Sequence, residues 1–344
     1  MSPKVIVAIL NYNTRNFLEK FLPSLWHTDY PNYEVIVIDN ASTDDSVEYL
    51  HKTYPEMRVI TLSKNYGFSG GYNEGLKGIE GDYYVLLNSD VEVTPNWMNP
   101  VIQHMELDIA VAASMPKLLS YREAHFFEYA GAAGGFIDRF GYPFCRGRIF
   151  EKVERDEGQY NSIREVFWAS GAAMFVRKKA WDEVKGLDAD FFAHMEEIDL
   201  CWRLKNRGYK ITCVPDARVY HLGGGTLTRE NPRKTRLNFR NALIALVKNM
   251  SLAELIWKIP VKLCLDGVAG IRFLFTGQWS NTIAILQAHF LFYAGLPYWI
   301  GKRKESRAKL NPNKVGLLKG SIVWRAFIRK KYQFSQVDAS IIKH

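Results

Sequence analysis

The sequence predicts an α/β fold with a doubly wound, mostly parallel sheet in residues 1–250, followed by a helical tail rich in basic and aromatic residues over 251–344. Three observations support this prediction. From residue 4 to about 115, short β-branched runs alternate with segments whose apolar residues recur at helical spacing. Polar residues gather where the predicted strands end. Finally, residues 251–344 hold 15 Lys or Arg against 4 Asp or Glu, whereas the first 250 residues hold 30 against 32.

The predicted strands are apolar runs that end at polar turns. They are Val5–Leu10, Glu34–Asp39, Arg58–Leu62, Tyr83–Asn88, Ala172–Val176 and Ile211–Val214. Helical patterns include Lys179–Val184 and Glu197–Asn206. We interpret the opening residues as a buried strand and not as a signal peptide, because the apolar run ends at Asn11 without a small-residue cleavage site.

Residues 120–165 lack a clean period and carry Gly131, Gly134, Gly135, Gly141 and Gly147 among aromatic residues and arginines. This pattern indicates either a loop that faces a substrate or a surface excursion with some β-hairpin. The 4 cysteines have no CxxC spacing, which argues against a zinc ribbon and indicates a reducing, cytosolic compartment.

Two polar turns follow predicted strands and have the residue types of a ligand site. Asp39 precedes a run of helix-capping residues, so this turn either caps the next helix or offers a carboxylate to the imide N–H of uracil or thymine. The turn Asn88–Glu92 carries the carboxylates that Mg²⁺ or Mn²⁺ prefers when it shares its coordination with phosphates. A solvated acidic turn is the alternative.

Three further features have both a functional and a structural interpretation. The glycines of Asn65–Gly75 do not match GxGxxG, and they serve either close approach to a ligand or tight helix packing. Glu196, Glu197 and Asp199 place three carboxylates within four residues, either as an acidic first turn of a helix or as a functional cluster. His221 is either a structural hydrogen-bonding residue or a ligand.

Read in order, seven segments of the chain resemble family-two glycosyltransferases with the GT-A fold, especially the branch of bacterial rhamnosyltransferases and galactofuranosyltransferases. The likeness covers residues 4–250. Its segments are Val7–Asn13, Val35–Ser46, Asn65–Gly75, Leu86–Val93, Ser170–Lys178, Phe191–Tyr209 and Val219–Thr226. Each segment is weakly specific, whereas seven in the correct order are highly specific.

The resemblance implies a role for each matching residue. It implies that Tyr12 stacks on the base of a nucleotide-sugar donor and that Asp39 binds this base. Asp90 is similar to the metal-binding carboxylate of the family, and His221 to a histidine that helps hold a divalent metal, Mg²⁺ or Mn²⁺, and the diphosphate. Glu92 is an accessory metal ligand by the same resemblance. The remaining implied substrate-binding residues are Asn13, Asn65, Gly70, Gly71, Asn88, Trp168 and Ser170.

The chain departs from the family pattern at two positions. Asn88 stands where the first aspartate of the metal motif is usual, and Glu197 stands where the catalytic base is usually an aspartate, with Glu196 as the alternative base. The implied reaction is inversion: a carboxylate takes the proton of an acceptor hydroxyl opposite the leaving nucleoside diphosphate, UDP or dTDP. A noncatalytic nucleotide-sugar or glycan-binding module with the same fold is the alternative function.

The tail interleaves its cations with aromatic residues in stretches too apolar for a nucleic-acid-binding arm. We therefore expect no nucleic acid as a partner, and we expect interfacial helices that place the enzyme peripherally on the cytoplasmic face of the cell membrane. The acceptor would then be a glycan, polyprenyl-linked according to the resemblance. A helical subdomain that mediates homo-oligomers is the alternative role for this tail.

Overall fold

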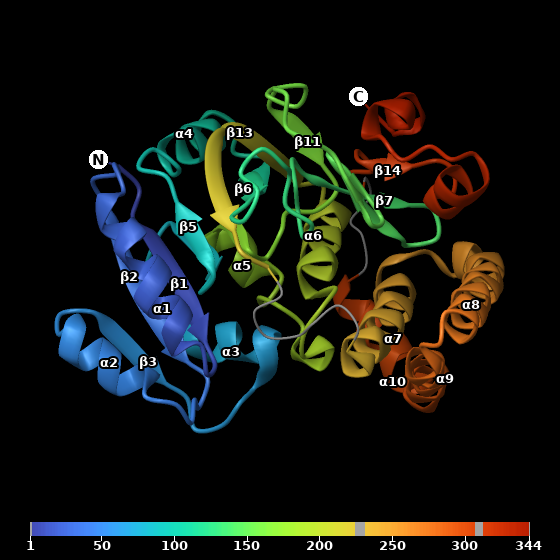
Figure 1. The fold of residues 1–344 in the computed structure, drawn as a ribbon, viewed down its shortest axis with the longest axis horizontal. Helices are drawn as coiled ribbons and strands as arrows, with labels where there is room; N and C mark the ends of the chain where they lie inside the picture. Colours follow the sequence, from blue (N-terminus) through green and yellow to red (C-terminus); the bar gives the residue numbers. More distant parts are fainter. Residues whose placement is uncertain (1, 224–230, 307–311, 344) are drawn as a thin grey trace.

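A large sheet forms the centre of the computed structural model, which describes residues 2–223, 231–306 and 312–343 (Figure 1). The nine strands described in this sheet have the order β11-β13-β6-β12-β4-β1-β2-β3, and β5 pairs with β13. They are β1 (Val5–Asn11), β2 (Tyr33–Asp39), β3 (Arg58–Thr61), β4 (Tyr83–Asn88), β5 (Val91–Val93), β6 (Val111–Ser120), β11 (Arg164–Val166), β12 (Ala173–Arg177) and β13 (Lys210–His221).

The sheet is parallel where the sequence predicted it. β1 pairs in parallel with both β2 and β4, and β2 pairs in parallel with β3. Residues Val5–Ile9 of β1 are at most 2% exposed, because a central parallel strand is covered on both faces. The carboxyl ends of β1, β2 and β4 therefore meet at one edge, whereas β12 lies antiparallel between β4 and β6.

The predicted helices are confirmed to within one residue at each end. α5 spans Lys178–Glu183 and α6 spans Glu196–Asn206. The last predicted strand is longer than expected, since β13 continues across a register shift to His221. The helices of the first half are α1 (Arg15–Phe21), α2 (Ser46–Thr53), α3 (Gly67–Gly75) and α4 (Asn99–Leu107).

The aperiodic segment 120–165 forms a second, smaller sheet, which is more than the hairpin that the sequence suggested. Its order is β10-β9-β8-β7-β14, with β7 (Gly135–Asp138), β8 (Pro143–Cys145), β9 (Arg148–Ile149), β10 (Lys152–Val153) and β14 (Leu317–Leu318). Because β14 comes from the tail and pairs with β7, the tail and this segment complete each other. This pairing is a long-range contact that local periodicity does not reveal.

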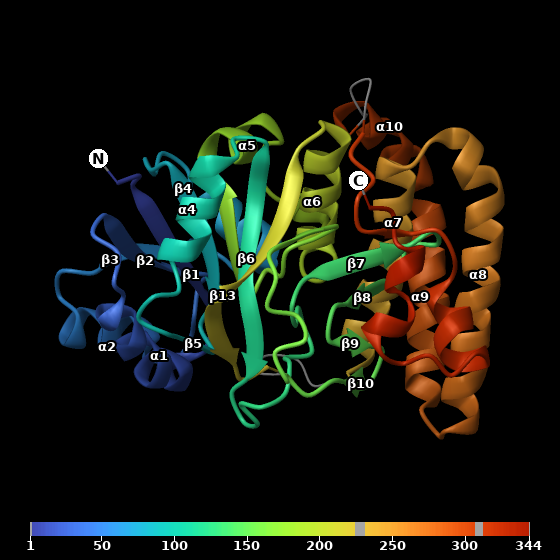
Figure 2. The same ribbon diagram turned by 90° about the horizontal axis from the view of Figure 1, so that it is seen from above.

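The tail consists mainly of helices at the end of the molecule away from β3 (Figures 1 and 2). α7 (Pro232–Asn249), α8 (Leu252–Phe275), α9 (Trp279–Ala294) and α10 (Leu296–Ser306) pack together, and one hydrophobic cluster runs from Val5 to Ile341.

In the described part of the chain, no single helix is long and apolar enough to cross a membrane. α9 and residues 296–304 of α10 meet the length and composition criteria together, but they are bent by 62°.

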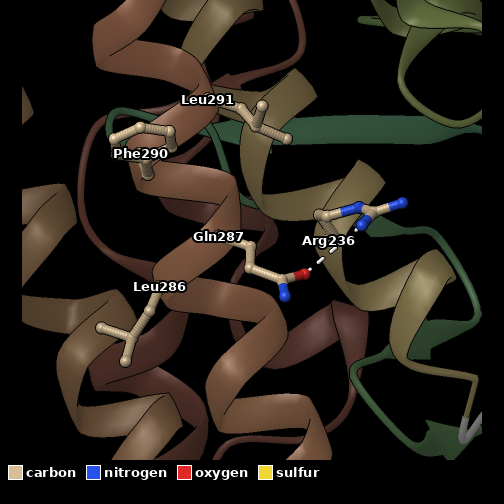
Figure 3. A pocket seen from close by; sticks show the side chains of 5 residues that line it. All are labelled: Arg236, Leu286, Gln287, Phe290 and Leu291. Carbon is tan, nitrogen blue, oxygen red and sulfur yellow. Dashed lines mark hydrogen bonds between the residues drawn. The ribbon is translucent and has the colours of Figure 1, made fainter.

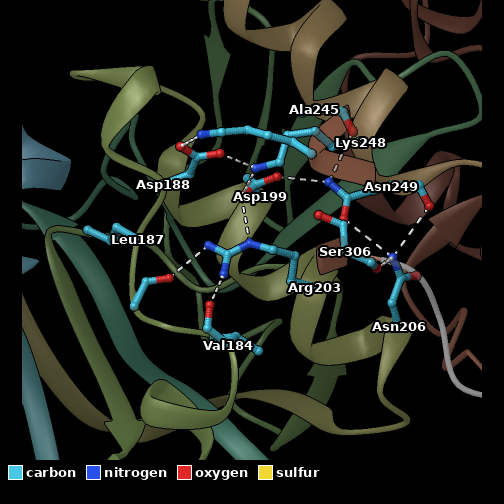
Figure 4. A network of polar contacts seen from close by, with 12 residues as sticks. Val184, Leu187, Asp188, Asp199, Arg203, Asn206, Ala245, Lys248, Asn249 and Ser306 are labelled. Atoms are coloured by element: carbon cyan, nitrogen blue, oxygen red, sulfur yellow. Dashed lines mark hydrogen bonds and ion pairs between the residues drawn. The ribbon is translucent and has the colours of Figure 1, made fainter. Parts of the chain in front are cut away.

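A buried ionic network fixes α6 against α7 (Figure 4). Asp199 of α6 accepts from Arg203 Nε at 2.7 Å and from Lys248 Nζ of α7 at 2.9 Å. Lys248 also pairs with Asp188, and all these side chains are at least 90% buried. Burial alone would raise the pKa of Asp199, but Lys248 and Arg203 lower it below its ordinary value.

We predict that Lys248→Met lowers the free energy of unfolding by about 3–5 kcal/mol, because it leaves Asp188 and Asp199 buried with too few cations. Urea unfolding at pH 7 measures this loss. Lys179→Met, on an exposed lysine, should change the free energy by less than about 0.5 kcal/mol. An equally small loss in both variants would contradict the role assigned to the network.

Candidate active site

Three residues that follow β1 and β2 form the first part of the site. Asp39 is 1% exposed; its Oδ1 accepts from Asn11 Nδ2 at 2.8 Å and its Oδ2 from the backbone N–H of Ser42 at 3.0 Å. Asn13, at φ 54°, accepts from the backbone N–H of Thr43 with its side chain. Tyr12 is 41% exposed at the same edge, so its ring is open to a ligand. Asp39 thus organises the turn, and its contact with a base stays a prediction.

The glycine-rich segment is an α-helix whose glycines serve packing. A Cβ on Gly71 would lie 2.6 Å from Leu10, and one on Gly70 would lie 2.9 Å from Tyr66 Cβ. Asn65 Oδ1 accepts from Asn40 Nδ2 at 3.1 Å and fixes the start of this helix. Tight helix packing therefore accounts for Gly70 and Gly71, and ligand contact at these glycines and at Asn65 stays a prediction.

Asp90 and His221 meet although they are 131 residues apart. Asp90 Oδ1 lies 3.1 Å from His221 Nε2, and Asn88 Nδ2 lies 3.4 Å from the same nitrogen. On the other side of the ring, Glu128 Oε1 lies 3.3 Å from His221 Nδ1. Glu128 is 6% exposed and lies in the aperiodic segment, where no local sequence pattern distinguishes it as a site residue.

The charges in this cluster depend on one another. Burial alone would lower the pKa of His221, but Glu128 and Asp90 raise it to about 10. Burial alone would raise the pKa of Asp90, but the hydrogen bond from His221 and its charge lower it below the ordinary value. The two carboxylates thus favour the protonated imidazole of His221, and a metal ion that binds Nε2 would have to displace this proton.

Glu92 lies apart from this cluster. In the β5–β13 pair, Val91 is opposite His221 and Glu92 is opposite Tyr220. Because neighbouring side chains of a strand point to opposite faces, Glu92 points away from the face that carries His221. Glu128 takes the place that the sequence assigned to Glu92 as a second carboxylate.

Asp90 and His221 suit a divalent cation that takes most of its ligands from the bound substrate and from water. Among the described residues, no three His, Cys, Asp or Glu side chains have the arrangement of a complete metal site. Mg²⁺ and similar hard cations are commonly bound by one or two protein ligands and complete their coordination with phosphate oxygens and water. A carboxylate beside an imidazole meets this requirement.

Glu196 and Glu197 begin α6 as a pair of carboxyl groups with few compensating contacts. Burial and the charge of Glu197 raise the pKa of Glu196 well above its ordinary value, and burial raises the pKa of Glu197 to about 7. The Oε2 atoms of both residues are buried without a hydrogen-bond partner. Glu196 is only 5% exposed, whereas Glu197 keeps part of its surface open. Glu197 is thus the more exposed of the two.

A strained segment sets the position of this pair. Phe192, His194 and Met195 have φ values of 62°, 69° and 73°, which non-glycine residues rarely adopt. Asn241 of α7, fully buried, donates to the carbonyl oxygens of Phe191, Ala193 and His194 at 2.8–2.9 Å. These bonds hold the strained backbone in place. Asn241 is a positioning residue that helical periodicity alone could not identify.

The segment Ser170–Ala172 connects the two clusters. The carbonyl of Ala172 accepts from the backbone N–H of Asn88 at 3.0 Å, and a Cβ on Gly171 would lie 3.7 Å from Glu197 Cβ. Ser170 donates to the carbonyl of Ala130, and the Trp168 indole donates to Phe136 and is 3% exposed. Asn88, Asp90, His221 and Glu197 therefore lie in one region, whereas ligand contact by Ser170 and Trp168 stays a prediction. Residues Gly224–Thr226 of the last matching segment lie outside the described residues.

Comparisons with known proteins bear on the family and the fold. Residues 6–179 match the family described as Glycosyl transferase family 2. A relative named N-acetylglucosaminyl-diphospho-decaprenol L-rhamnosyltransferase, from Mycobacterium tuberculosis, is 26% identical over 290 residues, which is 79% of this chain and 92% of the relative.

Two solved structures share the fold. The mannosyltransferase PcManGT from Pyrobaculum calidifontis, in complex with GDP-Man and Mn²⁺, aligns with 89% of this chain and 85% of its own at 14% identity and a TM-score of 0.50. GalNAc-T7 with UDP, GalNAc and Mn²⁺ aligns with 64% of this chain and 43% of its own at 17% identity and a TM-score of 0.53. At these identities the likeness establishes the GT-A fold.

We predict that Glu197→Gln stabilises the protein increasingly as the pH rises from 5 to 8. The folded state raises the pKa of Glu197 from 4.5 to about 7, so the folded protein binds this proton more tightly than the unfolded chain does. Stability is consequently lost as the pH rises through 7, by about 2–3 kcal/mol for this group. Urea unfolding at pH 5 and at pH 8 measures the difference in the free energy of unfolding between the variant and the wild type. Glu80→Gln is the exposed control. A difference that does not depend on pH would contradict the raised pKa.

Proposed function

The chain belongs to glycosyl transferase family 2 and is a glycosyltransferase, and we propose that it transfers a sugar with inversion from a nucleoside-diphosphate donor to a hydroxyl of a lipid-linked glycan. The observation that carries the proposal is the Glu196–Glu197 pair beside the edge where β1, β2 and β4 end. Buried carboxyl groups without partners cost stability, and strongly perturbed pKa values cluster at functional sites.

Glu197 acts as the general base. A carboxylate with a pKa of about 7 is matched to a proton transfer near neutral pH. As the acceptor oxygen attacks the anomeric carbon, its proton passes to Glu197 and the bond from that carbon to the diphosphate oxygen breaks on the opposite face. The configuration at the anomeric carbon is thereby inverted.

The other residues of the site bind the donor. The exposed ring of Tyr12 suits stacking on a base at the edge where Asp39 orders the turn, and uridine and thymidine nucleotides both fit an acceptor group there. Asp90 and His221 would hold a divalent cation, Mg²⁺ or Mn²⁺, that supplies positive charge to the leaving diphosphate when it is bound.

The nature of the acceptor is inferred from a relative. The name of the Mycobacterium tuberculosis relative describes rhamnosyl transfer to a diphospho-decaprenol-linked sugar, and the match covers most of this chain and of the relative. We extend to this chain a polyprenyl-diphosphate-linked acceptor and a role in cell-surface polysaccharide synthesis. A noncatalytic sugar-binding module would not require a carboxylate oxygen of each of Glu196 and Glu197 to stay buried without a partner among the described residues.

We also propose that the tail attaches the enzyme to the cytoplasmic face of the membrane. α8 buries charged side chains and exposes apolar ones, which is the reverse of an ordinary surface helix. Lys258, Lys262 and Asp266 are buried, whereas Ile256 is 77% exposed and Phe275 89% exposed. Asp266 accepts from Tyr142 Oη at 2.9 Å and pairs with Lys262, so the polar face is satisfied inside. An exposed apolar face beside a tail charge of +11, from 15 basic and 4 acidic residues, suits an anionic lipid surface.

The catalytic assignment predicts that Glu197→Gln lowers kcat by about 10²- to 10⁴-fold, because the acceptor hydroxyl loses its base. Transfer is measured with a panel of nucleotide sugars, Mn²⁺ and a lipid-linked acceptor. Glu196→Gln, whose side chain is buried, should retain most of its kcat. A large loss in Glu196→Gln together with an active Glu197→Gln would assign the base to Glu196.

The membrane proposal predicts that replacing Leu274 and Phe275 by serine weakens binding to vesicles of phosphatidylglycerol and phosphatidylcholine by at least roughly 10-fold, since each exposed side chain loses apolar burial. Vesicle co-sedimentation measures the effect. Leu107→Ser, on a leucine that is 88% exposed in α4, is the matched control. Dissociation of an oligomer in the double variant, without loss of vesicle binding, would instead assign the face to subunit contact.

A further inference from the structure

An open groove runs between α7 and α9 on the side of α7 that carries arginines. Its larger end has a volume of about 410 Å³ and is lined by Arg236, Leu286, Gln287, Phe290 and Leu291 (Figure 3). Its smaller end, of about 240 Å³, is lined by residues that include Arg233, Arg236 and Ile283. Both ends share Arg236 and Gln287, so they form one continuous groove.

The cationic part of the groove lacks acidic partners. Within residues 2–223, 231–306 and 312–343, neither Arg233 nor Arg236 has a carboxylate within ion-pair distance. Arg236 donates to Gln287 Oε1 at 3.3 Å, and the Arg233 guanidinium lies 5.1 Å from the centre of the Phe192 ring. Guanidinium groups bind phosphates through paired N–H donors, so two of them without carboxylates suit a diphosphate.

The apolar part of the groove is open to solvent. Leu286 is 64% exposed and Phe290 72% exposed, and they lie one helical turn apart on the same side of α9 in Figure 3. Side chains of this size gain free energy when an apolar ligand covers them. The groove thus combines two unpaired cations with an exposed apolar wall, which is the combination that a prenyl diphosphate requires.

The groove is also linked to the catalytic base through the strained segment. Arg233 contacts Phe192, and Arg240, two turns further along α7, donates to the carbonyl of Asp190 at 2.8 Å. This segment leads directly into Glu196 and Glu197. A diphosphate at the arginines would therefore place the attached sugar on the side of α7 that faces the base.

On this basis, and resting on the proposed function, we propose that the α7–α9 groove binds the lipid end of the acceptor. Arg233 and Arg236 hold its diphosphate, and Leu286, Phe290 and Leu291 contact the first units of the prenyl chain. The groove thereby selects a prenyl-diphosphate-linked acceptor over a free sugar.

Binding of farnesyl diphosphate, a soluble probe, tests this assignment without depending on catalysis. Calorimetry in the presence of EDTA prevents a metal at Asp90 and His221 from capturing the diphosphate. We expect Arg233→Gln and Arg236→Gln each to weaken binding by roughly 10-fold or more. Phe290→Ser should weaken binding of farnesyl diphosphate but leave that of inorganic diphosphate unchanged.

Matched controls and a second assay separate the possible outcomes. Arg58→Gln and Ile109→Ser alter an exposed arginine and an exposed isoleucine far from the groove, and they should bind the probe like the wild type. Absence of binding, or binding that the groove substitutions do not change, would overturn the proposal. If Arg236→Gln weakened binding to phosphatidylglycerol vesicles as much as it weakened binding to farnesyl diphosphate, the proposal would also be overturned. The groove would then be a phospholipid headgroup site.

Transfer assays distinguish this inference from the proposed function. In Arg236→Gln, metal-dependent hydrolysis of the donor should be retained while KM for the lipid-linked acceptor rises by roughly 10-fold. Donor hydrolysis with an unchanged acceptor KM would remove only the groove assignment. Probe binding by a protein that hydrolyses no nucleotide sugar would leave the groove in place and remove the proposed catalysis.

Discussion

The placement of two carboxyl groups at the start of α6 is the constraint on which the rest of the site depends. Among the described residues, one carboxylate oxygen of each is buried without a hydrogen-bond partner, which opposes folding, and so does the left-handed backbone of Phe192, His194 and Met195 just before them. α7 offsets both costs, because Asn241 binds three carbonyl groups of the strained segment and Lys248 binds Asp199 one turn into α6. The helix that follows the α/β half in sequence is thus a structural part of the active site.

The donor side of the site is organised by the ends of strands that are distant in sequence. β4 delivers Asn88 and leads to Asp90, whereas β13, entering from the other half of the sheet, delivers His221. Glu128 completes the cluster from the segment that leads into the small sheet. For the proposed cation this arrangement would supply Asp90 and, once deprotonated, His221, and the remaining ligands would come from the donor.

The tail has two different surfaces with different chemical characters. Toward the small sheet it is well packed, through β14 and through Asp138, which accepts from the backbone N–H of Ile322 at 2.9 Å. Away from it, α8 and α9 present exposed apolar side chains while Lys258, Lys262, Asp266 and Asn281 are buried. A surface with this polarity suits a lipid phase, and the groove with Arg236 lies next to it, so the proposed attachment and the proposed acceptor binding would have a common physical basis.

The sequence by itself determined the parallel strands, the first helices and the order of the family motifs. Each of these depends on local periodicity or on residue types at strand ends, as in Val5–Ile9 and Tyr83–Asn88. It also pointed to Asp90, His221 and Glu197 through their resemblance to family motifs. Only the tertiary structure decided that Glu128 and not Glu92 lies beside His221, that packing explains Gly71, that Asn241 binds the backbone just before Glu196 and that β14 joins β7. These features are contacts between residues far apart in the chain, and a local pattern carries no information about which distant side chain will become its neighbour.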